Sequence, residues 1–291
     1  MFGQRTLDRL DRMLDEAIAG TFKESDYDES KLSKVESKWK HFLSASALSR
    51  ENVEKEKDRV KELVSDISHQ TKTPMANIRL YTELLKERLD RENLCLPEEK
   101  DRQENLRLLA EIDRQAEKLG FLIQSLTKMS RLESNIVEVR PKQLYVSELI
   151  DAVVQDILPK AGKKNLEVVN TYAGSGIAYY DMKWTKEALG NIVDNAVKYS
   201  PCGSRVFLSV TEYKLYTAVS VKDFGAGIRE EDTAKIFRRF YRTEDVHDED
   251  GVGIGLYLAR EIVKRENGYI KVKSKPGQGA EFMMYLSRRE F

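Results

Sequence analysis

The sequence has little cysteine, little proline and no long apolar run. Its two cysteines, Cys95 and Cys202, lie far apart and form no CxxC pattern. We therefore expect free thiols in a reducing compartment, with no disulfide framework and no cysteine zinc site. Because no apolar run exceeds a few residues, we predict neither a membrane span nor a signal peptide. The chain is expected in the cytoplasm, by itself or as the cytoplasmic portion of a membrane-anchored protein.

The chain also lacks an excess of charge of either sign. Lys plus Arg and Asp plus Glu both number 49, so the formal net charge is zero. This balance disfavours nucleic-acid binding through bulk electrostatics. Charged residues still make up 34% of the 291 residues, which is typical of a soluble, helix-rich protein. The length is sufficient for about two domains.

Up to about residue 133 the pattern is helical. Apolar and small residues recur at alternating spacings of four and three, which predicts the heptad seam of a coiled coil or helical bundle. The first seam comprises Val60, Val64, Ile67, Thr71, Pro74, Ile78, Tyr81 and Leu85. The second seam comprises Leu109, Ile112, Ala116, Leu119, Ile123 and Leu126. Between them, residues 91–99 contain Asn93 and Pro97, which suit a helix–helix connection.

A hairpin of two helices buries little apolar surface by itself. We therefore expect two copies to form a four-helix bundle, so that the protein is a homodimer. Residues 1–54 are predicted to be a helical segment that carries an input signal or acts as a linker. Part of this segment is amphipathic, with Leu7, Leu10, Leu14 and Ile18 at helical spacing.

After Pro141 the pattern changes to short stretches of alternating apolar and polar residues. Strands are predicted at residues 205–210, 217–221, 269–274 and 281–286. Helices are predicted at 184–200 and 253–268, the second with Gly268 as its C-terminal cap. The second part of the chain is therefore predicted to be an α/β domain with glycine-rich loops.

A single histidine lies within the first seam, in the stretch SDISHQTKTP. If Val64 takes heptad position a, His69 falls at position f, which is farthest from the seam and open to solvent. A lone helical histidine is more often structural or incidental, yet an exposed neutral imidazole is also available as a nucleophile. Pro74 cannot donate a hydrogen bond to the carbonyl of Gln70, so we predict a bend one turn after His69.

The predicted helix at 184–200 carries polar groups that suit a polyphosphate. Asn191, Asn195 and Lys198 share one helix face. An amide oxygen can ligate Mg²⁺ and an ammonium can meet phosphate. By itself this pattern is equally typical of a solvated polar face.

Three loop segments add to this pattern. The stretch DFGAGI, from Asp223 to Ile228, directly follows a predicted strand and suits a turn with close backbone approach to a ligand. The stretch GVGIGL opens a predicted helix, where backbone N–H groups can cradle phosphate. Residues 229–250 are highly charged, as in a lid over a site, and include the aromatic and arginine-rich stretch IFRRFYR. Alone, each segment is also typical of a surface turn or a core cluster.

The order H-x-x-x-T-P, N-x-x-x-N, D-x-G-x-G, F-x-x-F and G-x-G-x-G resembles the two-component sensor histidine kinases over about residues 55–291. The second part is also similar to the ATPase fold of DNA gyrase, of mismatch-repair ATPases and of heat-shock chaperone ATPases. The resemblance implies a multidomain chain, first α and then α+β. A dimerisation and histidine-phosphotransfer hairpin would occupy residues 55–135, and a two-layer α/β sandwich that binds ATP would occupy residues 136–291.

The resemblance also implies roles for individual residues. His69 would accept the γ-phosphoryl group of ATP and pass it to an aspartate of a response regulator, and Thr73 would position water if the protein acts as a phosphatase. Asn195 would ligate Mg²⁺, Asp223 would accept a hydrogen bond from the adenine amine, and Arg242 would reach the γ-phosphate. The other residues expected at the nucleotide are Asn191, Lys198, Tyr199, Gly225, Gly227, Gly251, Gly253, Gly255 and Leu256.

The sequence departs from the commonest family pattern at Gln70, where a carboxylate is usual. Glutamine can accept a hydrogen bond from the imidazole and fix its tautomer, but it cannot act as a base. We therefore expect a competent kinase with a tuned rate, in which phosphatase activity is the branch most affected.

Two other functions are open to a chain with these motifs. A non-catalytic scaffold or degenerate kinase would bind nucleotide or regulator only, and would lack a phosphate-site residue, whereas none is missing here. A conformational ATPase of the same fold would turn over ATP without labelling a histidine. The hairpin that carries His69 favours the ATP-dependent histidine kinase.

Overall fold

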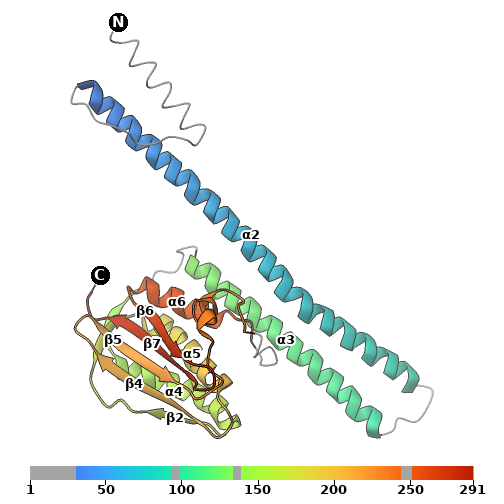
Figure 1. Ribbon diagram of the computed structural model, residues 1–291. Helices are drawn as coiled ribbons and strands as arrows, with labels where there is room; N and C mark the ends of the chain where they lie inside the picture. The colour runs from blue at the N-terminus through green and yellow to red at the C-terminus, as the bar shows by residue number, and fades with distance from the viewer. Residues whose placement is uncertain (1–30, 93–98, 134–138, 244–250, 291) are drawn as a thin grey trace. The chain divides into compact units, whose positions relative to one another are not determined.

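The computed structural model describes residues 31–92, 99–133, 139–243 and 251–290 (Figure 1). Parts of three segments for which the sequence makes predictions lie outside the described residues: 1–30 of the N-terminal segment, 93–98 of the helix connection and 244–250 of the charged segment. The chain divides into two compact units between Lys72 and Thr73.

Two long helices make up the described residues before 134. Helix α2 spans Lys31–Glu92 and helix α3 spans Glu99–Glu133. Near the connection, Arg88 of α2 forms an ion pair with Glu104 of α3. Pro74 lies inside α2, and the helix continues through it without interruption. The proline therefore does not break the helix, and the predicted bend stays a prediction.

The buried residues of α3 lie on a different face from the predicted seam. They are Gln115, Leu122, Ser125, Met129 and Leu132. Leu132 joins the core of the following domain, whereas Leu119 and Leu126 of the predicted seam are half-buried against a second apolar cluster. Leu109 and Ile123 of the predicted seam are 46% and 55% exposed.

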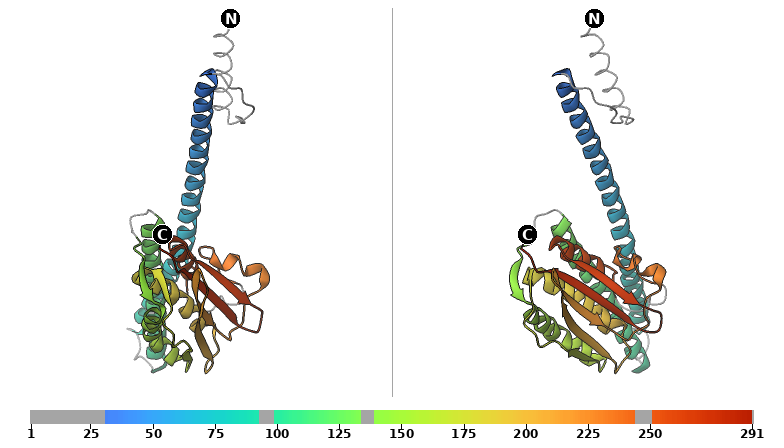
Figure 2. Two further views of the ribbon diagram at one scale, coloured as in Figure 1. Left: turned by 90° about the vertical axis from the view of Figure 1, so that its left-hand side faces the viewer. Right: turned by 60° about the vertical axis from the view of Figure 1, so that its left-hand side comes forward.

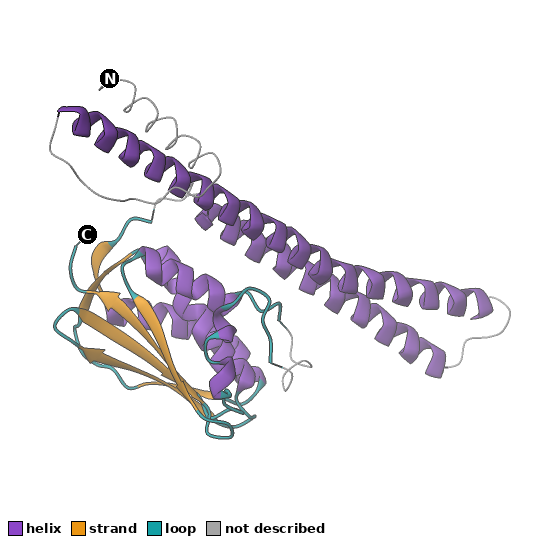
Figure 3. Cartoon of the chain, turned by 45° about the horizontal axis from the view of Figure 1, so that its top comes forward, coloured by secondary structure: helices purple, strands orange, loops and turns teal. Residues whose placement is uncertain are grey.

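The rest of the chain is an α/β sandwich, with one layer of strands and one of helices (Figures 2 and 3). Its helices are α4 (Val146–Lys163), α5 (Met182–Tyr199) and α6 (Gly255–Arg265), with short 3-10 turns η1 (Glu230–Asp232) and η2 (Lys235–Phe237). Its strands are β1 (Lys142–Tyr145), β2 (Glu167–Asn170), β3 (Ile177–Tyr180), β4 (Arg205–Glu212), β5 (Tyr216–Lys222), β6 (Tyr269–Ser274) and β7 (Ala280–Ser287).

The main sheet has the strand order β2-β4-β5-β7-β6. Only β2 and β4 pair in parallel, and the other neighbours are antiparallel. Strands β1 and β3 form a separate antiparallel pair. All four strands predicted from the sequence are therefore present, and β1, β2 and β3 are additional.

Alternation along the strands places one face of the sheet against the helices. Val219 and Val221 of β5 and Met284 of β7 are fully buried, because residues two apart in a strand point to the same face. The helices meet this face with apolar stripes at helical spacing, such as Leu149, Ile150 and Val153 of α4. The core holds α5 and α6 in place at the site described below.

The end of α6 differs in detail from the prediction. The left-handed residue that follows the helix is Asn267, with φ of 53°, and not Gly268. The N–H of Gly268 donates to the carbonyl of Val263 at 2.9 Å, which satisfies a terminal carbonyl of the helix. Asparagine tolerates the left-handed conformation, so the left-handed position falls one residue before the predicted glycine.

Candidate active site

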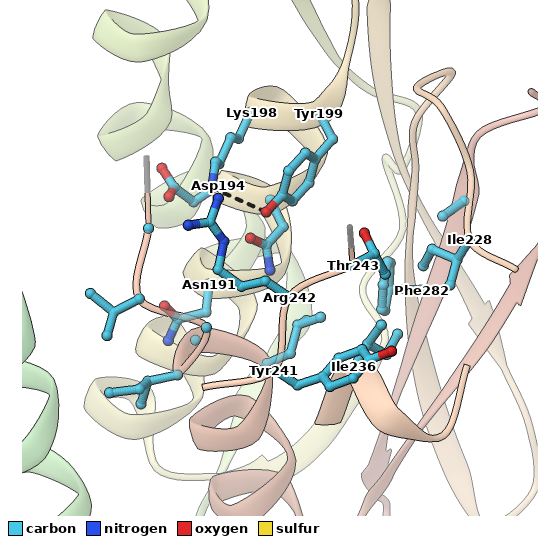
Figure 4. A pocket seen from close by; sticks show the side chains of 18 of the residues that line it. Asn191, Asp194, Lys198, Tyr199, Ile228, Ile236, Tyr241, Arg242, Thr243 and Phe282 are labelled. Atoms are coloured by element: carbon cyan, nitrogen blue, oxygen red, sulfur yellow. Dashed lines mark hydrogen bonds between the residues drawn. The ribbon is translucent and has the colours of Figure 1, made fainter. Parts of the chain in front are cut away.

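Helix α5 places four polar side chains on one wall of a cleft. Its N-terminus is fixed by Asp181, whose carboxylate accepts hydrogen bonds from the N–H groups of Lys183 and Trp184. One stripe of the helix, including Ile192 and Val193, is fully buried in the core. The opposite stripe lines the cleft with Asn191, Asn195, Lys198 and Tyr199, as the sequence predicts (Figure 4).

Two details of this wall suit a phosphate ligand. The Nδ2 atom of Asn191 is buried and has no hydrogen-bond partner among the described residues. A buried donor without a partner is costly, so a ligand that accepts from it would be favoured. The Nζ atom of Lys198 lies 3.1 Å from the hydroxyl of Tyr199 and 4.6 Å from the centre of its ring.

The turn after β5 holds a buried carboxylate at the floor of the cleft. Asp223 is 5% exposed, and its Oδ1 accepts hydrogen bonds from the N–H groups of Gly225 (2.9 Å) and Ala280 (3.1 Å). Burial raises the pKa of Asp223, while these two hydrogen bonds oppose the shift. Both bonds end on Oδ1, so Oδ2 is the oxygen left for a donor in the cleft.

The glycine-rich loop closes the opposite side of the cleft. Gly251, Gly253 and Gly255 all line it, and α6 begins at Gly255, two residues after the predicted start of the helix. Gly253 has φ of +74°, and a Cβ there would lie 2.8 Å from the carbonyl oxygen of Tyr241. A Cβ on Gly251 would lie 2.8 Å from Nζ of Lys198. The loop backbone therefore approaches the lysine that α5 presents.

The segment between β5 and α6 adds charged and aromatic groups. Arg242 lines the cleft together with its neighbour Tyr241 (Figure 4). The hydroxyl of Tyr241 donates to Asp232, which is buried and also pairs with Arg229 and Lys235. The hydrogen bond from Tyr241 is the main cause that lowers the pKa of Asp232. This carboxylate thus anchors the residues that lead to Arg242.

The structure brings together nearly all of the residues predicted at the nucleotide. Gly227 and Leu256 also line the cleft, whereas Gly225 does not and instead packs behind it against α5. The residues that the sequence analysis missed are mostly apolar or next to predicted ones: Phe121, Asp194, Ala226, Ile228, Ile236, Tyr241, Thr243, Val252, Ile254, Ala280 and Phe282. Isoleucine and phenylalanine in strands and turns carry no motif, so only the fold assigns them to the cleft.

The predicted acceptor histidine lies on helix α2. His69 and Thr73 are exposed, Gln70 is half-buried and Pro74 is buried. Ser68 and Thr71 donate from their hydroxyls to the carbonyls of Val64 and Ile67, both at 2.8 Å. The exposure of His69 agrees with its predicted heptad position.

Comparison with known proteins gives the class of the chain. Residues 180–290 match the family described as histidine kinase-, DNA gyrase B- and HSP90-like ATPase. Residues 59–135 match the His Kinase A (phospho-acceptor) domain. The matched part of the chain is therefore a phospho-acceptor domain followed by an ATPase domain of this type.

Individual relatives agree with this class. Sensor protein SrrB of Staphylococcus aureus is 25% identical over 232 residues, which is 79% of this chain and 38% of SrrB. The structure of Acinetobacter baumannii histidine kinase AdeS has a TM-score of 0.54 and 20% identity, and covers 76% of this chain and 98% of that one. Histidine kinase ThkA in complex with response regulator protein TrrA has a TM-score of 0.61 and 20% identity, and covers 83% of this chain and 66% of that one.

The chain belongs to the two-component sensor histidine kinases. It spans less than two-fifths of the length of the curated relatives that it matches. Among the helices that the structure describes, none is long and apolar enough to cross a membrane.

Proposed function

We propose that this protein transfers the γ-phosphoryl group of ATP to His69 and then to an aspartate of a response regulator. The observation that carries the proposal is the convergence of four separate polar and glycine-rich segments on one cleft, in a chain that also presents His69 to solvent. The predicted domains are part of the proposal: an input segment at 1–54, a phosphotransfer hairpin at 55–135 and an ATP-binding domain at 136–291.

The cleft has distinct regions for the base and the phosphates of ATP. Asp223 would accept a hydrogen bond from the adenine amine, and Ile228, Ile236 and Phe282 would contact the base. A buried carboxylate that meets a donor on the ligand discriminates strongly, because a ligand without that donor leaves it unpaired. Tyr199 would flank the nucleotide.

The phosphates would lie between α5 and the glycine-rich loop. Lys198 and Arg242 supply positive charge there, and Asn191 supplies the unpartnered Nδ2 donor. Backbone N–H groups at Gly251, Gly253 and Gly255 suit phosphate oxygens at the start of α6. As the resemblance implies, Mg²⁺ would be held by the amide oxygen of Asn195, the nucleotide and water. Bound Mg²⁺ would offset the charge on the phosphates.

The reaction at His69 needs positioning more than covalent help from other side chains. A lone pair on the imidazole would form the nitrogen–phosphorus bond while the bond from the γ-phosphorus to the bridging oxygen breaks, so that ADP leaves. The nitrogen–phosphorus bond would break in turn when an aspartate oxygen of the regulator attacks the phosphorus. Gln70 would orient the imidazole, and Thr73 would position water when the protein removes phosphate from the regulator.

The exposed apolar residues of α2 and α3 suggest a second copy of the chain as a partner. Val60 and Val64 are 52% and 57% exposed, although they belong to the predicted seam, and Leu109 and Ile123 are exposed as well. A second copy would cover them in a four-helix bundle. ThkA has been seen in complex with a response regulator, and we infer that such a regulator also docks on α2 and α3 here. The proposal also includes membrane anchoring of the intact sensor.

Labelling with γ-labelled ATP and Mg²⁺ tests the proposed function. We expect a label on the protein that is lost in acid and stable in base, as for a phosphohistidine. The label should be absent from His69→Ala. The matched control is His41→Ala, because His41 is an exposed histidine on the same helix. Label that persists in His69→Ala would refute the proposal, and so would steady ATP hydrolysis without any labelled protein.

A further inference from the structure

The C-terminus of α5 differs from those of α4 and α6, because no left-handed residue directly follows its C-cap. Pro201 follows directly after Ser200, and the residue before a proline is driven out of the helical conformation. Ser200 accordingly has φ of −77° and ψ of 143°, and the helix ends at Tyr199. The last carbonyl groups of a helix have no partner within it, so those of α5 need donors from elsewhere.

Lys164 supplies these donors from the end of α4. Its ammonium donates hydrogen bonds to the carbonyl of Lys198, to that of Ser200 at 3.3 Å and to that of Val197 at 3.5 Å. A cation at this end also interacts favourably with the helix dipole. The carbonyl of Lys164 in turn accepts from the N–H of Gly203 at 3.0 Å, so the two helix ends are joined in both directions.

The capped end of α5 is where three parts of the cleft meet. Lys198 and Tyr199 line the cleft, and Nζ of Lys198 lies against the glycine-rich loop at Gly251. On the other side, a Cβ on Gly225 would lie 2.3 Å from the carbonyl oxygen of Tyr199. The turn that carries Asp223 therefore rests directly on the same backbone. A small shift of residues 198–200 would move all three parts.

We infer that Lys164 is a positioning residue for the nucleotide site. Lys164 is not one of the residues that line the cleft. It acts through the backbone carbonyls of Val197, Lys198 and Ser200. By holding these carbonyls it sets where the ammonium of Lys198, the ring of Tyr199 and the Asp223 turn lie. The inference rests on the proposed function, because it assigns the residue to the binding of ATP in this cleft.

The expected effect is a loss of nucleotide affinity with little change in the rate at saturation. Calorimetric titration with ADP and Mg²⁺ should give a Kd about tenfold higher for Lys164→Met than for the unmodified chain, as expected at the lower end for one lost hydrogen bond to a charged group. Autophosphorylation should show a similar rise in KM for ATP and an unchanged rate at saturating ATP. Lys164→Arg, which keeps a cationic donor, should restore the Kd to within about twofold.

Two further variants separate positioning from a general loss of structure. Lys163→Met is the matched control, because Lys163 is the exposed neighbour in the same helix end, and its Kd should not change. Lys164→Gln keeps a donor without the charge and should lie between the Met and Arg variants, which also serves if Lys164→Met does not fold. A Kd for Lys164→Met equal to that of the unmodified chain would overturn the inference. The inference would also be overturned if Lys164→Met lost nucleotide affinity and autophosphorylation rate at saturating ATP to the same extent, and Lys164→Arg restored neither. An unmodified chain that does not bind ADP would overturn the proposed function itself.

Discussion

The helix that carries His69 and the cleft in the α/β domain differ in how they are built. Around His69 the hydroxyls of Ser68 and Thr71 donate to backbone carbonyls one turn earlier in the same helix. In the cleft, Asp223 is held by N–H groups from two different segments, at Gly225 and at Ala280. The local structure around His69 is formed by one helix, whereas the position of Asp223 depends on several segments of the α/β sandwich.

This difference predicts how each site responds to substitution. At the helix the chemistry depends on the identity of one exposed side chain, so neighbouring changes should alter rates without altering stability. In the cleft the chemistry depends on backbone placement and burial, so changes should alter binding and stability together. The following predictions test that contrast, beginning with the largest expected effect.

Asp223→Asn should abolish most of the nucleotide affinity. The amide oxygen can still accept from Gly225 and Ala280, but the amide NH₂ presents a donor where the adenine amine also donates. We expect a Kd for ADP with Mg²⁺ about a hundredfold higher, measured by calorimetry. The control is Asp151→Asn on the exposed side of α4, which should bind as the unmodified chain does. Comparable affinity for the two variants would contradict the assigned role of Asp223.

Glu266 should make the stability of the α/β domain depend on pH. It is fully buried just after α6, where its carboxylate accepts hydrogen bonds from Thr185 (2.8 and 2.9 Å) and from the N–H of Asp181 (2.9 Å). Burial raises the pKa of Glu266 from 4.5 to about 7, although these hydrogen bonds oppose the shift. The folded state therefore binds the proton more tightly than the unfolded state does.

The sign of the pH effect follows from this raised pKa. The stabilisation is fully present below the unfolded pKa of about 4.5 and is lost as the pH rises through about 7. Denaturant unfolding should therefore show a fall in the free energy of unfolding of up to about 3 kcal/mol from pH 5 to pH 8. Glu266→Gln should flatten this fall, whereas Glu261→Gln, on the half-exposed part of α6, should retain it. If the free energy of unfolding depended on pH in the same way in both variants, Glu266 would not be the cause of the fall.

Gly225→Ala should destabilise the domain by about 2 kcal/mol and weaken nucleotide binding. A Cβ at this position would lie 2.3 Å from the carbonyl oxygen of Tyr199, so the turn or α5 must move. Gly190→Ala is the matched control, because a Cβ there has no atom within 4 Å and the residue lies inside α5. It should be neutral or stabilise by up to about 1 kcal/mol. Thermal unfolding that ranks the two variants in the reverse order would refute the close approach.

Gln70→Glu should have the smallest effect and leave stability unchanged. Glutamate can accept a hydrogen bond from the imidazole and can also act as a base. We expect autophosphorylation or regulator dephosphorylation to rise by about two- to tenfold, which is less than a full general-base effect because glutamine already orients the imidazole. Initial rates measured with labelled ATP and with a phosphorylated regulator test this. If both rates stay the same, Gln70 is not the residue that tunes the reaction.

The same contrast explains what could be predicted from the sequence. The heptad spacing placed His69 on an exposed helix position, because helix faces follow directly from residue spacing. The four longer strands and α5 were predicted for the same reason. Strands β1, β2 and β3 were missed because four residues, such as EVVN, are too short for an alternating pattern to stand out.

The cleft was predicted only in part. Asparagine, aspartate and glycine patterns identified most of its polar and glycine residues, since these types are needed for ligand contact and close approach. Ile228, Ile236 and Phe282 were not predicted, because apolar residues in a core look alike in sequence. Lys164 could not be assigned either, since its contact with the end of α5 joins residues more than thirty positions apart.

The central claim is that ATP bound in the cleft transfers its γ-phosphoryl group to His69. Mass-spectrometric mapping of the phosphorylated protein, kept at alkaline pH after incubation with ATP and Mg²⁺, tests it most directly. The account predicts phosphate on the peptide that contains His69 in the unmodified chain, and none in Asn195→Ala. Phosphate found on another residue, or a phosphorylated His69 that persists in Asn195→Ala, would contradict it.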